Sequence, residues 1–178
     1  MIGRLRVALM AGWMAMAAGP LAMAGDYDQA LFVLSQAFPD VKSVGVFYDD
    51  KGTVFNLLEF EGSAFKEFGL GIKLVPLDAK QRLTHESIRK LCNQHRLQAV
   101  LLLEGDSLVK PGSTAGRAIV NGAGHLPVAG IELAWLADGS WFVVGPATKG
   151  LQIGPKVRDA KVKEALRLAG EALVKKDG

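Results

Sequence analysis

The sequence has little cysteine and little net charge, and each shortage excludes a class of protein. Only one cysteine, Cys92, is present, so no disulfide can form within the chain, and we expect this thiol to be buried and inert. Charge is also nearly balanced. If Arg4 and Arg6 are removed with an export signal, 19 basic side chains face 18 acidic ones. A balance this even gives no basis for nucleic-acid binding.

The sequence also lacks the residue patterns that catalysis and metal binding require. His85 and His95 lie ten positions apart on one predicted helix, too distant to share a metal ion, and no zinc-ligand spacing is present. Neither Ser107 nor Ser113 lies in a Gly-x-Ser-x-Gly elbow. Gly69-x-Gly71 ends a helix and begins a strand, the reverse of a dinucleotide fingerprint. We therefore expect no cofactor, no metal and no enzymatic activity.

The first 24 residues have the pattern of a cleaved export signal. Arg4 and Arg6 give the positive start, and 7–18 is an apolar run too short for a secure membrane span. Small residues follow at Ala22 and Ala24, the two positions that a signal peptidase inspects. The sequence therefore predicts a mature chain that begins near Gly25 and works in the periplasm, with one domain over 25–178.

Helical and strand-like segments alternate along that domain. This alternation predicts an open, mostly parallel sheet of five strands with helices on both faces, in the flavodoxin-like order 2-1-3-4-5. Strands are expected at 43–48, 71–77, 99–103, 126–131 and 141–144. Helices are expected at 28–38, from about 54 to 68, from Thr84 as its cap, at 113–121, briefly at 132–137 and at 156–175.

The expected core follows from helical spacing. In the second helix Phe65 and Phe68 fall on one face with Val54, Leu57 and Leu58, and we expect this face to be buried. In the third, the inner face is predicted to be Ile88, Leu91, Cys92 and His95. The aliphatic run 99–103 is typical of a central strand covered on both sides.

Several segments, in order, resemble one family. The run Phe38-Pro39-Asp40-Val41-Lys42-Ser43-Val44-Gly45-Val46-Phe47-Tyr48-Asp49 resembles the opening of the second lobe in periplasmic substrate-binding proteins of ABC transporters. The likeness continues through 68–74, 97–103, 126–130, 144–146 and 151–154. Members of that family clamp a solute between two lobes, and only one lobe is present here. The resemblance thus implies a single binding-protein-like lobe.

Polar residues beyond the carboxyl ends of the strands are the candidate binding residues, because ligands of open parallel sheets sit there. The resemblance implies that family contacts fall near Thr53, Asp106 and Glu132. Carboxylates at this edge would pair with an amine- or hydroxyl-bearing solute, and the ring of Trp135 would stack on that solute. Each residue also has a structural interpretation, as a helix cap, a turn, a loop or core packing. The predicted ligand-binding set is Asp50, Thr53, Asp106, Ser107, Glu132 and Trp135.

These observations favour an exported periplasmic solute-binding or sensory accessory protein. Its expected partners are a small-molecule solute and a protein that supplies the opposite wall of the cleft. That protein would be a second copy of the chain, a membrane permease, an outer-membrane receptor or a sensor. The alternative is a periplasmic protein-interaction module that has lost ligand binding.

Overall fold

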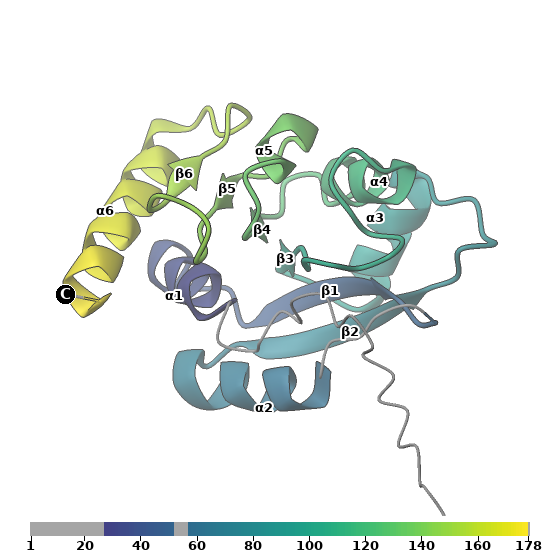
Figure 1. The fold of residues 1–178 in the computed structure, drawn as a ribbon, viewed down its shortest axis with the longest axis horizontal. Coiled ribbons are helices and arrows are strands. Elements are labelled where there is room, and N and C mark those ends of the chain that lie inside the picture. Colours follow the sequence, from purple (N-terminus) through teal and green to yellow (C-terminus); the bar gives the residue numbers. More distant parts are fainter. Residues whose placement is uncertain (1–26, 52–56, 178) are drawn as a thin grey trace, which may run out of the picture.

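The computed structural model describes residues 27–51 and 57–177, which form one α/β unit around a six-stranded sheet (Figure 1). The strand order is β2-β1-β3-β4-β5-β6, and the first five strands in this order pair in parallel. This confirms the predicted fold class and the order 2-1-3-4-5. The strands are β1 Ser43–Asp49, β2 Gly71–Leu77, β3 Ala99–Leu101, β4 Val128–Gly130, β5 Phe142–Val143 and β6 Gln152–Ile153.

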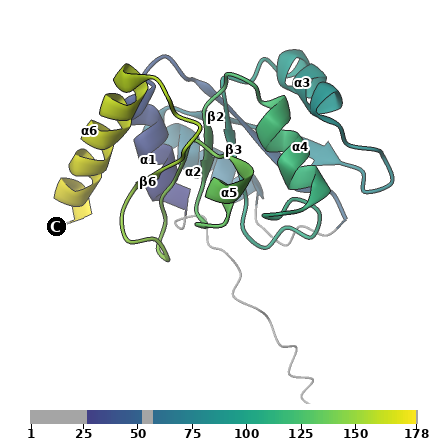
Figure 2. The same cartoon turned by 90° about the horizontal axis from the view of Figure 1, so that it is seen from above.

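Helices cover both faces of the sheet, as the alternation of elements predicted. Helices α1, α2 and α6 contribute to the core on one face, and α3, α4 and α5 to the core on the other. Figure 2 shows α1 and α6 on one side of the strands and α3 and α4 on the opposite side. The helices are α1 Asp28–Ala37, α2 Leu57–Phe68, α3 His85–Gln94, α4 Thr114–Gly122, α5 Trp135–Asp138 and α6 Ala160–Asp177.

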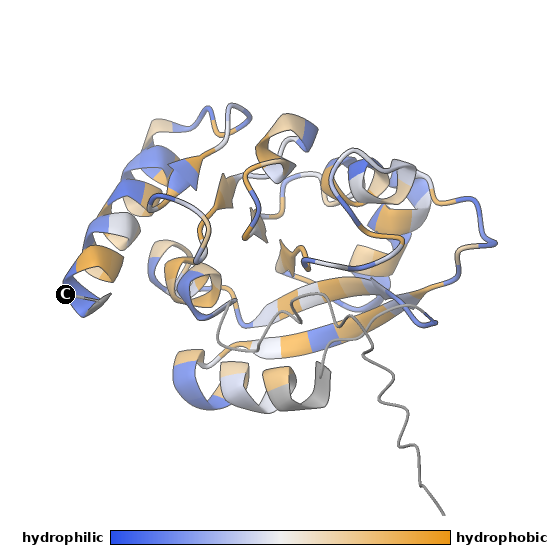
Figure 3. Cartoon of the chain, viewed as in Figure 1, coloured by the Kyte–Doolittle hydropathy of each residue, from blue (hydrophilic) through white to orange (hydrophobic). Residues whose placement is uncertain are grey.

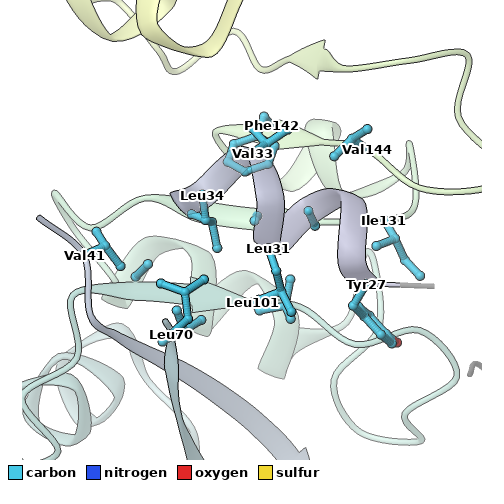
Figure 4. Packing of buried hydrophobic residues seen from close by; sticks show 14 of the residues in the cluster. Tyr27, Leu31, Val33, Leu34, Val41, Leu70, Leu101, Ile131, Phe142 and Val144 are labelled. Carbon is cyan, nitrogen blue, oxygen red and sulfur yellow. The ribbon is translucent and has the colours of Figure 1, made fainter. Parts of the chain in front are cut away.

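The aliphatic run that contains β3 explains how one sheet serves two cores. Side chains of a strand alternate between faces. Leu101 and Leu103 accordingly join the core under α1 and α6, whereas Val100 and Leu102 join the core under α3 and α4. Figure 4 shows Leu31 of α1 directed toward Leu101, and Figure 3 shows β3 in the orange of apolar residues. A strand with apolar residues on both faces is therefore buried on both.

The sixth strand was not predicted. β6 pairs antiparallel with β5, with Phe142 opposite Ile153 and Val143 opposite Gln152. A pair of two-residue strands carries no alternation that a sequence pattern could detect. The sheet therefore has six strands rather than the expected five, and the additional strand forms an antiparallel edge.

Three local predictions are also corrected. Phe65 is 68% exposed, and among the α2 side chains that the structure describes, Phe60 and Ala64 are buried. His95 is exposed because it caps the end of α3 instead of lying on its inner face. The last helix begins at Ala160 rather than 156, after Asp159, whose Oδ1 accepts the N–H of Lys161 at 2.7 Å.

Three predictions fall outside what the structure describes: the export signal at 1–24, the candidate residue Thr53, and the buried side chains of Val54, Leu57 and Leu58 in the second helix. Among the helices that the structure does describe, none combines the length and the apolar character needed to cross a bilayer.

Gly116 of α4 provides a test of this packing. A Cβ at this position would lie 2.6 Å from the carbonyl oxygen of Lys110 and 2.8 Å from the ring of Trp135. We therefore expect Gly116→Ala to lower the free energy of unfolding by about 1–3 kcal/mol, since a backbone carbonyl cannot move aside cheaply. Urea denaturation followed by circular dichroism measures this.

Gly62→Ala in α2 is the matched control, because a Cβ there meets no atom of the described residues within 4 Å. Alanine at an open helical position should raise the free energy of unfolding by about 0.5–1 kcal/mol. Equal effects of the two substitutions would contradict the described contact between α4 and Trp135.

Candidate functional site

Because the five parallel strands run in one direction, their carboxyl ends meet at one edge of the sheet. We call this the carboxyl edge. It is formed by the residues that follow Asp49, Leu77, Leu101, Gly130 and Val143, the last residues of β1 to β5. The predicted binding residues are drawn from the connections after β1, β3 and β4.

Asp106 joins two of these connections through its carboxylate. Its Oδ2 accepts the backbone N–H of Asp49, at the end of β1, at 2.9 Å. Its Oδ1 accepts the N–H groups of Leu108 and Val109 at 2.9 and 2.6 Å. The side chain is only 4% exposed. Hydrogen bonds to an ionised carboxylate are stronger than neutral ones, so Asp106 holds the connection after β3 against the end of β1.

Ser107 adds a second link between the same two connections. Its Oγ donates to Oδ2 of Asp49 at 2.6 Å. The other carboxylate oxygen of Asp49 accepts the N–H of Lys51 at 3.1 Å, which closes the turn after β1. Asp49, one position before the predicted Asp50, is therefore the residue that links these loops.

Tyr27 holds the start of the connection after β3, a role that no sequence pattern indicates. The Tyr27 hydroxyl accepts the backbone N–H of Glu104 at 2.8 Å. Its ring is fully buried and lies 5.5 Å from the ring of Phe60, between centroids. An aromatic residue just before the first helix belongs to no recognisable pattern, and only the tertiary fold shows that it reaches the edge (Figure 4).

Glu132 and Glu104 bring two carboxylates together at the connections after β4 and β3. Partial burial raises the pKa of the Glu132 carboxyl above its ordinary value, and the neighbouring charge of Glu104 raises this pKa further. Within the described part of the chain, neither carboxylate has a basic side chain within 4 Å. This pair therefore forms an uncompensated negative site at the carboxyl edge.

The remaining predicted residues are placed differently. Asp50 is exposed in the turn after β1. The expectation that Trp135 is open to a solute is wrong, because its side chain is 0% exposed. Its ring lies against Gly116 and Gly130, where an added Cβ would come within 3 Å of it. Trp135 therefore packs in the core, which is the structural interpretation that the sequence also allowed.

The described residues contain no group of three or more His, Cys, Asp or Glu side chains arranged to hold a metal ion. Cys92 is buried, as predicted, and burial raises the pKa of its thiol to about 11. The thiolate that would act as nucleophile or ligand is therefore scarce at neutral pH.

Comparison with known proteins shows similarity at the level of the fold. No family model matches the chain, and no curated protein sequence matches it significantly. Several solved structures are similar, including the following two. One is a conserved domain protein from Vibrio cholerae, with 15% identity over 84% of this chain and a TM-score of 0.50. The other is an ABC domain from Streptococcus pneumoniae in complex with L-Trp, with 13% identity over 83% of this chain and a TM-score of 0.52.

This chain spans less than half the length of either protein, 45% and 44% respectively. At such low identity the likeness shows a shared binding-protein-like fold.

The role of Asp106 can be tested by replacing it with asparagine. In Asp106→Asn one acceptor oxygen becomes an NH₂ group, so the N–H groups bound to that oxygen lose their acceptor, while the remaining amide oxygen can still accept. We expect the free energy of unfolding to fall by about 1–3 kcal/mol, as measured by urea denaturation. Asp50→Asn removes an equal charge from the exposed turn nearby and should change stability by less than about 0.5 kcal/mol. Two indistinguishable variants would show that Asp106 does not join the loops.

The pair formed by Glu104 and Glu132 predicts a pH-dependent effect of Glu132→Gln. The raised pKa means that ionised Glu132 destabilises the fold at neutral pH and that this cost disappears once the carboxyl is protonated. At pH 7.5 we expect the variant to melt about 1–2 °C higher than the wild type, after allowance for screening by solvent. At pH 4 the difference should vanish. A stabilisation that is equal at both pH values would rule out the charge as its cause.

Proposed function

We propose that the protein is an exported periplasmic solute-binding or sensory accessory protein whose carboxyl edge forms one wall of a cleft for a small molecule. The observation that carries this proposal is the pair of Glu104 and Glu132, which lacks a basic partner within the described residues. A solute with an amine would neutralise the pair, and hydroxyl groups would donate to its oxygens.

The hydrogen bonds that hold the connection after β3 to the end of β1 support the same proposal. A binding wall works best when its polar groups are already held in place, because less ordering is then required on binding. Asp106 and Ser107 both hold the connection after β3 to the end of β1. Since the solved neighbour with a similar fold contains L-Trp, amino acids are the first class of solute to test.

A single wall buries too little of a small molecule for tight binding. The opposite wall would come from a second copy of the chain or from a different protein. A membrane permease of an ABC transporter, an outer-membrane receptor or a membrane sensor would fit the proposed periplasmic location.

Other observations favour the alternative of a protein-interaction module that has lost ligand binding. Among the predicted binding residues, Asp106 and Ser107 are engaged with neighbouring loops, and Trp135 is buried. On this alternative the exposed carboxylates of the edge would meet a partner protein and no solute.

A thermal-shift panel of amino acids, polyamines, sugars and nucleobases at pH 7.5 distinguishes these two functions. A ligand at about one hundred times its Kd stabilises a fold by about 2.7 kcal/mol, which corresponds to a rise of roughly 5–10 °C for a chain of this size. We expect such a rise with at least one amine-bearing solute. We also expect Glu132→Gln to weaken its binding by about 10–100-fold, because a charge-assisted hydrogen bond is lost.

Asp40→Asn is the matched control, since it removes one exposed carboxylate from the opposite edge of the sheet, before β1. This variant should respond to the solute as the wild type does. A flat panel would favour the interaction module, and a solute that binds equally well to Glu132→Gln would place the site elsewhere.

A further inference from the structure

We propose that a groove beside α4 is a docking surface for an acidic, partly apolar segment of a partner protein. One wall of this α4 groove is the connection from β2 into α3, residues 79–85, and the other is the exposed side of α4. The inference is independent of solute binding at the carboxyl edge, because none of the residues that line the groove belongs to the predicted binding set.

Small residues on α4 create the groove. Ala115 and Ala118 are buried at its floor, and Leu83 and Leu108 border them as half-buried side chains. Farther along α4, Gly122 lies against α3, where a Cβ would come within 2.7 Å of the His85 carbonyl oxygen. The helices therefore touch near Gly122, and a hollow of about 640 Å³ remains open toward the start of α4. Figure 1 shows α3 and α4 side by side, with the connection from β2 projecting beyond them.

The charged groups at the groove are all potentially cationic. Arg82 stands on the wall formed by the connection, Arg117 stands on α4, and His85 lies at the start of α3. No Asp or Glu lines the groove, and neither arginine forms an ion pair within residues 27–51 and 57–177. A guanidinium binds a carboxylate through two parallel hydrogen bonds, so two arginines without ion pairs match two acidic side chains.

The apolar floor of the groove favours a protein segment over a small free anion as the occupant. An inorganic anion bound by the arginines would leave the apolar floor in contact with water. A segment that combines carboxylates with aliphatic side chains would satisfy both parts, because its apolar residues would cover the floor while its acids reach Arg82 and Arg117. The open shape of the groove also suits an extended or helical segment better than an enclosed small molecule.

Chemical-shift mapping with the full chain tests this proposal. The probe is a short synthetic peptide of glutamate and leucine, capped at both ends, and its counterpart carries lysine in place of each glutamate. We expect millimolar glutamate–leucine peptide to move the backbone amide signals of residues 82–85 and 114–118, and the lysine peptide to leave them unchanged. Arg82→Glu combined with Arg117→Glu should weaken binding by at least about tenfold.

Lys90→Glu combined with Lys161→Glu is the matched control, because it changes the net charge equally at exposed positions outside the groove. This variant should bind the peptide as the wild type does, and circular dichroism should show that both double variants remain folded. The proposal is overturned if no amide signal moves, or if both peptides bind alike. It is also overturned if inorganic phosphate alone reproduces the shifts with equal affinity, or if the control variant weakens binding as much as the arginine variant.

Discussion

The carboxylate of Asp106 is the interaction on which the arrangement of the carboxyl edge depends. It accepts N–H groups from both the end of β1 and the connection after β3, at a position from which water is largely excluded. These two strands are neighbours in the sheet, so one buried charge sets the spacing of the loops above them. Tyr27 holds the same connection two residues earlier, at Glu104. Without these bonds, several buried polar groups would have to find other partners.

The fixed loops place the acidic groups, and this placement connects the fold to the proposed function. The Asp106 carboxylate accepts backbone N–H groups, whereas neither Glu104 nor Glu132 forms an ion pair within the described residues, and burial together with the charge of Glu104 raises the pKa of Glu132. The edge thus contains two kinds of carboxylate. One kind maintains the structure, and the other remains available to a cationic group from outside. The basic α4 groove is lined by other residues than the predicted binding set, and its charged side chains have the opposite sign.

Much of the fold could be predicted because its local signals agree with its packing. The aliphatic run at 99–103 becomes a strand covered on both faces, and Thr84 caps α3 in a reciprocal pair of hydrogen bonds with Ser87. The failures arise where tertiary contacts decide. The two-residue strand β6 has no periodicity, Phe65 falls on the exposed side of α2, and Trp135 is covered because Gly116 and Gly130 leave room for its ring. The sequence predicted that the candidate binding residues follow the carboxyl ends of the strands, but it could not tell which of the carboxylates there are engaged in hydrogen bonds.

Hydrogen exchange of individual backbone amides tests the central claim most directly. If Asp106 holds the two loops together, the amides of Asp49, Leu108 and Val109 should exchange as slowly as those of Val100 and Leu102, which bond to the neighbouring strand. All five would then report the same cooperative opening. Exchange of the first three at the rate of an unprotected peptide, with Val100 and Leu102 still protected, would contradict the account.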